Sequence, residues 1–189
     1  MVKPIPLYFM SKEIPNSLEQ LLEKFPEIQP PITISEDSAV TFSSKNKPIS
    51  LDLIQEYFVI WDSFDEFTEI VPCFQLNVPN DYYGLVYWKG SLLSYEYILL
   101  ILSKDGTLIS KKVIAGTISN GQTIKKSVAT IDENLSIYTM VGEQDVSDLS
   151  YNPTHSSAYK FEIEVDGTIS SSQEEINLWE KEEKQERKN

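Results

Sequence analysis

The sequence is poor in the side chains on which most enzyme chemistry depends. It contains one histidine (His155), one cysteine (Cys73) and one arginine (Arg187) among 189 residues. A single cysteine cannot form an internal disulfide, and one imidazole with one thiol is too few for the usual zinc sites. Because no arginine precedes position 187, most of the chain lacks a planar guanidinium for bidentate binding of phosphate. We therefore expect no bound metal ion and no cofactor.

Longer patterns are missing as well. The chain has no glycine-rich phosphate-binding motif and no G-x-S-x-G nucleophile turn. Its longest strongly apolar run, residues 97–102, is far shorter than the roughly 20 residues that span a bilayer. Residues 1–11 lack the apolar core of a secretory signal. These absences predict a cytoplasmic protein that does not enter a membrane.

The charge balance is strongly negative, with 29 acidic against 16 basic residues and a net charge of -13. Nucleic acids and anionic membranes are bound mainly through Lys and Arg, so we expect neither as a partner. A negative field attracts cationic molecules, so a basic protein is the partner that charge favours. Acidity also serves solubility alone, and the sequence does not indicate an oligomeric state.

Two helices are expected in the first third of the chain. A capping-box pattern at residues 16–20 starts the first helix, and Pro26 ends it. Ser50 is the expected N-cap of the second, whose end is ambiguous because residues 57–61 are β-branched and aromatic. The apolar positions at helical spacing are Leu18, Leu21, Leu22 and Phe25 in the first helix, and Leu51, Ile54 and Phe58 in the second. Between the helices, residues 32–42 are predicted to hold a short strand and residues 43–47 a polar loop.

From residue 67 onward the pattern predicts strands joined by tight turns. The turn signals include Asn120-Gly121 and Asp166-Gly167, and Pro72 indicates an edge or a bulge in its strand. The expected strands cover residues 70–76, 82–89, 92–103, 107–115, 123–131, 135–141 and 158–165, with a last short strand after Gly167.

Tight turns join antiparallel neighbours, whereas parallel strands need long crossovers, and no helix-length segment lies between residues 82 and 142. We therefore predict one α+β domain over residues 1–172, with short N-terminal helices packed on a twisted antiparallel β-meander of about six to eight strands. Residues 173–189 are rich in Glu and Lys and are predicted to form a charged C-terminal tail that is partly helical or disordered.

Carboxylates are the reactive groups that the chain has in quantity. Asp62, Asp65, Glu66 and Glu69 are close together in sequence, and aromatic residues are interleaved with them. On a helix these four acids would share one face. Because glycosidases combine paired carboxylates with aromatic platforms, the four acids are weak catalytic candidates, and His155 is a weak candidate base. The simpler interpretation is an amphipathic turn with solvated acids and a histidine in a solvated loop.

The densest aromatic group lies in the strands predicted between residues 82 and 103. If these strands alternate regularly, several tyrosines line one face of the sheet. Tyr and Trp are favoured in protein interfaces, although ordinary cross-strand packing explains the same pattern. The candidate binding residues are Trp61, Trp88 and the four tyrosines expected on one face, Tyr83, Tyr87, Tyr95 and Tyr97.

A chain with so few groups that make or break bonds is expected to bind rather than to catalyse. The preferred function is a non-catalytic protein-binding module with an acidic, aromatic-bearing surface, and an immunity-type inhibitor of a cationic toxin is one form of such a module. One alternative is a carboxylate-dependent hydrolase acting on a carbohydrate. The other is a small-molecule carrier, which needs a sizeable apolar pocket.

Overall fold

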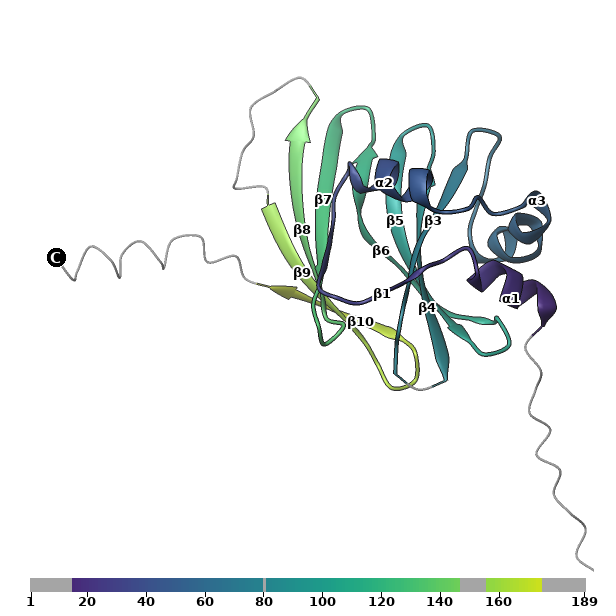
Figure 1. Ribbon diagram of the computed structural model, residues 1–189. Coiled ribbons are helices and arrows are strands. Elements are labelled where there is room, and N and C mark those ends of the chain that lie inside the picture. The colour runs from purple at the N-terminus through teal and green to yellow at the C-terminus, as the bar shows by residue number, and fades with distance from the viewer. Residues whose placement is uncertain (1–14, 80, 147–155, 175–189) are drawn as a thin grey trace, which may run out of the picture.

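A computed structural model describes residues 15–79, 81–146 and 156–174 of the chain (Figure 1). The helices are α1 (Asn16–Leu22), α2 (Ser38–Lys45), and a third helical segment formed by α3 (Leu51–Leu53), the π-helical turn η1 (Ile54–Phe58) and α4 (Val59–Trp61). The strands are β1 (Glu27–Ile28), β2 (Ile32–Ile34), β3 (Glu69–Leu76), β4 (Tyr82–Gly90), β5 (Ser94–Ser103), β6 (Leu108–Ser119), β7 (Thr123–Ile131), β8 (Ile137–Asp145), β9 (Ser156–Ile163) and β10 (Ile169–Glu174).

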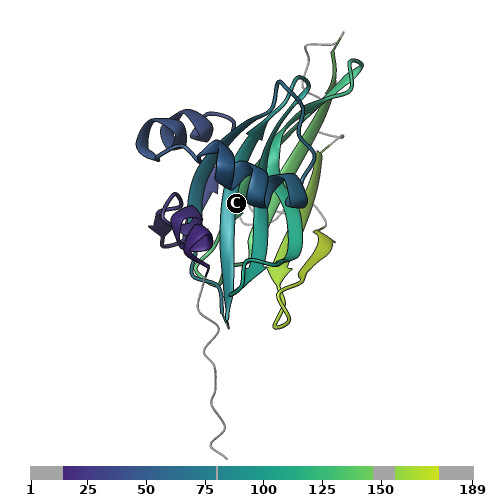
Figure 2. The same ribbon diagram turned by 90° about the vertical axis from the view of Figure 1, so that its right-hand side faces the viewer.

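All these strands belong to one ten-stranded sheet, which is strongly twisted (Figure 2). The strand order is β1-β3-β4-β5-β6-β7-β8-β9-β10, and β2 pairs with β7 off this path. Strands β3 to β10 form an antiparallel meander, whereas β1 pairs with β3 in parallel. The predicted α+β class and antiparallel meander are confirmed. The sheet has more strands than expected, in part because β1, of two residues, is too short for a pattern to predict, and because the short strand expected within residues 32–42 joins the same sheet as β2.

The central strands β4 and β5 are buried on both faces, and two cores result. On one face, α1 and the α3–α4 segment cover Leu85, Tyr87 and Leu100 of the sheet. The other face carries the second core, in which Val86 and Leu99 pack with residues from β2, β7, β8 and β9. The sheet therefore curls until its last strands approach β6, where the Ser110 hydroxyl donates a hydrogen bond to the Gly167 carbonyl at 2.7 Å.

The prediction for residues 32–47 is wrong beyond Ile34, because α2 forms where a strand and then a loop were expected. Helix α2 lies apart from α1 and α3 (Figure 1). Ala39 and Phe42 of α2 pack against the second core, and the Phe42 ring lies 5.6 Å from the Phe74 ring. Tertiary packing of these side chains therefore holds a helix in a segment whose Val, Thr and Phe content is typical of strands.

The other local predictions are met only in part. Helix α1 ends at Leu22, before Pro26, and no side-chain hydrogen bond caps its start, so the predicted capping box does not form. Residues 57–61, whose composition left the end of the second helix ambiguous, are helical as far as Trp61. The register of β3 against β4 shifts between Pro72 and Phe74, which is the bulge that Pro72 indicated. Of the predicted tail, residues 173 and 174 end β10, and the rest lies outside the described residues. No helix within the described ranges is long and apolar enough to cross a membrane.

Candidate functional site

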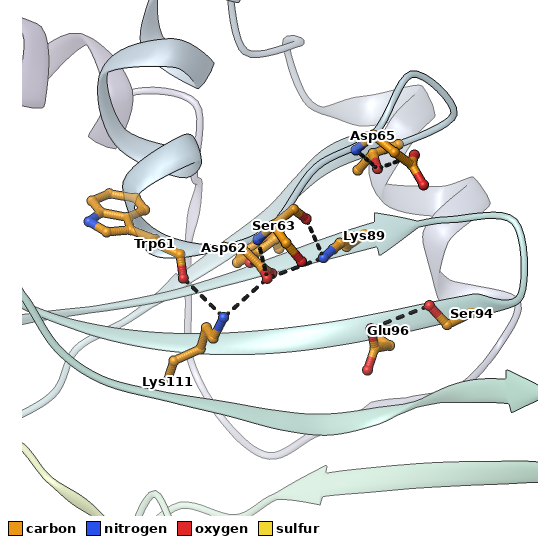
Figure 3. Close-up of polar contacts among 10 residues, drawn as sticks. Trp61, Asp62, Ser63, Asp65, Lys89, Ser94, Glu96 and Lys111 are labelled. Atoms are coloured by element: carbon orange, nitrogen blue, oxygen red, sulfur yellow. Dashed lines mark hydrogen bonds and ion pairs between the residues drawn. The ribbon is translucent and has the colours of Figure 1, made fainter.

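Asp62 is the most buried acid of the predicted cluster and lies at the junction of helix and sheet (Figure 3). It follows the last residue of α4 in an extended conformation, and its side chain is 10% exposed. Its carboxylate accepts hydrogen bonds from the Ser63 amide at 2.8 Å and the Tyr87 hydroxyl at 2.9 Å. The ammonium groups of Lys89 and Lys111 each lie 3.2 Å from the same carboxylate. Asp62 therefore joins the end of the helical segment to strands β4 and β6.

Both lysines also bind backbone carbonyls at the end of the helical segment. Lys89 donates to the Ser63 carbonyl at 2.8 Å, and Lys111 donates to the Trp61 carbonyl at 2.9 Å. Burial by itself raises the pKa of Asp62, but its hydrogen bonds from Ser63, Tyr87 and the two lysines outweigh this and leave the pKa below its ordinary value. Asp62 is thus an ionised residue with a structural role.

The other three acids of the cluster do not join Asp62. Because the helix ends at Trp61, the single helical face predicted for them does not form. Asp65 is exposed and accepts hydrogen bonds from Thr68 and from the Phe67 amide, which lower its pKa. Glu66 is exposed in the same turn, and Glu69 is the first residue of β3. The shared carboxylate face expected from the sequence is therefore wrong. His155 lies outside the described residues.

The candidate aromatic residues divide between the two faces of the sheet. Tyr97 pairs with Trp88 across β4 and β5, and Tyr87 pairs with Ile98. Directly paired residues point to the same face, so Tyr97 lies with Trp88 rather than with Tyr87. The expectation that the four tyrosines share a face is therefore wrong. The candidates that are at most 8% exposed are Trp61, Tyr83 and Tyr87 in the helix-covered core, and Tyr97 in the second core.

Trp88 and Tyr95 remain accessible and line a pocket of about 310 Å³ on the second face. Their rings are stacked, with centroids 5.8 Å apart and an angle of 14° between the planes. Helix α2 and strand β3 supply the walls, including the apolar side chains of Val40 and Val71. The pocket therefore combines a flat aromatic surface with aliphatic walls.

Tyr97 adds a third ring to this pocket and is 1% exposed. Its hydroxyl is buried and has no hydrogen-bond partner in the part of the chain that the structure describes. Burial is the main cause that raises the pKa of Tyr97, and the Ser38 hydroxyl and Ala39 backbone are close enough to moderate that rise. The first turn of α2 therefore lies next to the buried Tyr97 phenol.

A bulge in the sheet shapes the opposite side of the pocket. The register of β5 against β6 shifts between Tyr97 and Ile98, which leaves Ile114 of β6 without a paired residue. Two residues further along, Gly116 pairs with Glu96 and has φ +146. A Cβ atom at Gly116 would lie 2.1 Å from the Tyr95 carbonyl oxygen. Only glycine allows the two strands to approach this closely beside the pocket.

Two carboxylates line the pocket from separate elements. Glu36 precedes α2, and its carboxylate forms a 3.0 Å ion pair with Lys126 in which both side chains are more than half exposed. Glu69 begins β3 and has no ion pair within the described ranges. The arrangement offers negative charge beside the aromatic surface.

The sequence identified only some of the residues that form this pocket. Trp88, Tyr95, Tyr97 and Glu69 were candidates, but they were assigned to different groups. Glu36 was missed, because the segment that follows it was expected to be a strand. The Ser38 hydroxyl accepts a hydrogen bond from the Ser35 amide, but no side-chain hydrogen bond caps α2, so no capping pattern in the sequence indicated this helix.

Comparisons of the chain with protein-family models, with curated proteins and with solved structures found no match. The part of the chain that the structure describes contains no group of three or more His, Cys, Asp or Glu residues placed to hold a metal ion.

Proposed function

We propose that the protein is a non-catalytic binding module whose partner is a basic protein, and that the partner docks over the pocket formed by α2 and strands β3 to β6. The observation that carries this proposal is the stacked pair of Trp88 and Tyr95 in one pocket with Glu36 and Glu69. An inhibitor of a cationic protein is one form that such a module takes.

Charge and surface composition support a basic partner at this site. The net charge of -13 favours the approach of cationic molecules and speeds their encounter. Next to the pocket, Val40 is 72% exposed and Tyr95 is 46% exposed. Exposed apolar and aromatic residues are typical of the centre of a protein interface, and charged residues are typical of its rim.

The acids of the predicted catalytic cluster are less suited to hydrolysis. A general acid needs a raised pKa, whereas the pKa values of Asp62 and Asp65 are both lowered. Asp62 is also enclosed by its own lysines and Tyr87. These residues therefore do not support the alternative function of a carbohydrate hydrolase. The small-molecule carrier stays a prediction, since a pocket of about 310 Å³ is at the lower limit for drug-sized ligands.

A titration with peptides of defined charge tests the proposal. We expect nona-arginine and nona-lysine to change the tryptophan fluorescence of the protein, and nona-glutamate to have no effect. Binding should weaken between about 50 and 200 mM salt, because the attraction is between exposed charges.

Two double variants of equal charge separate the pocket from the net charge. Glu36→Gln with Glu69→Gln removes both pocket carboxylates, and Glu133→Gln with Glu164→Gln removes two exposed acids in turns outside the pocket. The pocket variant should bind the cationic peptides about tenfold more weakly, and the control should change by about twofold or less. Equal losses in the two variants, or binding of an uncharged apolar dye at the pocket without binding of the cationic peptides, would contradict the proposal.

A further inference from the structure

We infer that the group which enters the pocket is an arginine side chain of the partner, and that it displaces Lys126 from Glu36. This inference rests on the proposed function, because it names the chemistry of the partner at the same site. It is carried by the shape of the aromatic surface, the placement of the two carboxylates and the existing ion pair between Glu36 and Lys126.

The aromatic surface favours a planar cation. Trp88 and Tyr95 are stacked and nearly parallel, so the pair offers the flat face of a ring rather than a closed cage. A guanidinium is planar and weakly hydrated and stacks on such faces, whereas an ammonium is compact and strongly hydrated. The aliphatic part of an arginine would contact Val40 and Val71 on the walls.

The carboxylates favour a cation with several donors. Glu36 and Glu69 belong to different segments, one before α2 and the other at the start of β3. A guanidinium carries five N–H donors in one plane and can donate hydrogen bonds to acceptors on more than one side. The described ranges contain no arginine, since the only one is Arg187. No guanidinium within the described structure therefore competes for this pocket.

Lys126 does not line the pocket, but it already binds one of the two carboxylates that we assign to the incoming cation. Its ammonium lies 3.0 Å from the Glu36 carboxylate, and both side chains are exposed. Exposed ion pairs contribute little to stability, so an incoming guanidinium can replace Lys126 at small cost. Lys126 thus acts as an internal competitor that weakens binding.

The neighbouring Lys125 provides a matched control. The side chains of Lys125 and Lys126 are 55% and 57% exposed, and each pairs with one glutamate. The partner of Lys125 is Glu143, at 3.4 Å, and Glu143 does not line this pocket. Lys125→Gln and Lys126→Gln therefore change the net charge equally, but only Lys126→Gln frees a pocket carboxylate.

Three small probes distinguish the side chains in solution. N-acetylarginine methylamide, its lysine counterpart and its citrulline counterpart are titrated into the full chain, and the indole N–H resonances are followed by NMR. We expect saturable shifts of the Trp88 indole with arginine, binding several-fold weaker with lysine, and none with the uncharged citrulline. Lys126→Gln should bind the arginine probe about threefold more tightly than the parent, and Lys125→Gln should match the parent.

The outcomes separate this inference from the proposed function. If cationic peptides bind at the pocket but the lysine probe equals or exceeds the arginine probe, the arginine assignment is wrong and the proposed function stands. Equal binding of citrulline and arginine would show that charge is not recognised. Equal affinities of Lys125→Gln and Lys126→Gln would refute the competition by Lys126. If neither the cationic peptides nor the arginine probe binds, both the inference and the proposed function fail.

Discussion

Asp62 connects the helical layer to the sheet through one carboxylate. Its partners are Tyr87 and Lys89 on β4, Lys111 on β6 and the Ser63 amide beyond α4. The negative charge is stabilised only while these donors surround it, and the two lysines are stabilised in turn by the carboxylate. A residue that resembled a catalytic acid in the sequence therefore has a structural role.

Replacing Asp62 with asparagine should lower the free energy of unfolding by about 2–3 kcal/mol. The change leaves Lys89 without a counter-charge in a site where its side chain is 9% exposed, and this is the costly part of breaking a buried ion pair. Urea denaturation measures the effect. Asp65→Asn, in an exposed turn, is the control and should change stability by no more than about 0.5 kcal/mol. Similar losses in both variants would contradict the anchoring role.

The same contacts predict how stability depends on pH. The pKa of Asp62 is lower in the folded protein than its ordinary value of 3.8, so the unfolded chain binds a proton first as the pH falls. The contribution of Asp62 is complete above about pH 5 and is lost as the pH falls through the lowered pKa of the folded state. Urea denaturation between about pH 7 and pH 2 should therefore show the parent and Asp62→Asn converging in stability at low pH. A difference that stays constant over this range would refute the prediction.

At the scale of the elements, bulges determine where the pocket lies. Gly116 lies two residues from the bulge at Ile114, and its φ of +146 and close approach to Tyr95 leave no room for a side chain. A second bulge in β3 is held by Asn46, just beyond α2, because its side-chain amide donates to the carbonyls of Pro72 and Cys73 at 2.7 Å each. These hydrogen bonds join the end of helix α2 to an irregular part of the sheet, and side chains of α2 line the pocket together with Trp88.

Gly116→Ala should destabilise the protein by at least about 2 kcal/mol, because the added Cβ would lie 2.1 Å from a backbone oxygen and the strands must separate. Gly121→Ala is the matched control. It also has positive φ, +85, but nothing lies within 4 Å of the added Cβ, so only the backbone strain of about 1 kcal/mol remains. Thermal and urea denaturation compare the two variants. A smaller loss at Gly116 than at Gly121 would contradict the close contact.

At the scale of the whole molecule, the sheet is wide enough to form two cores. Helix α1 and the α3–α4 segment pack on one face of the first half of the sheet, and the last strands curl toward the other face. The helix-covered core encloses Tyr83 and Tyr87, while the other face leaves Trp88 and Tyr95 accessible. The two-sided burial of β4 and β5 therefore determines which aromatic residues are available to a partner.

The sequence by itself determined the local parts of this architecture. The local parts include the helix that contains Leu18 and Leu21, the turn at Asn120-Gly121 and the bulge at Pro72, and each depends on neighbours a few residues away. Such signals are strong because backbone preferences and short turns act within one segment. They were sufficient for the α+β class and for the antiparallel meander.

Only the tertiary structure decided how these segments meet. Strand β2 pairs with β7 across 97 residues, as the hydrogen bond between Thr33 and Thr130 shows, and α2 is held by packing on Phe74. The strand register places Tyr97 on the same face as Trp88. A shift of one residue would move Tyr97 to the other face, and the residue types alone do not reveal which register forms. The pocket, the placement of Glu36 and the anchoring of Asp62 arise from such long-range pairings. Their energies depend on contacts that no single segment contains.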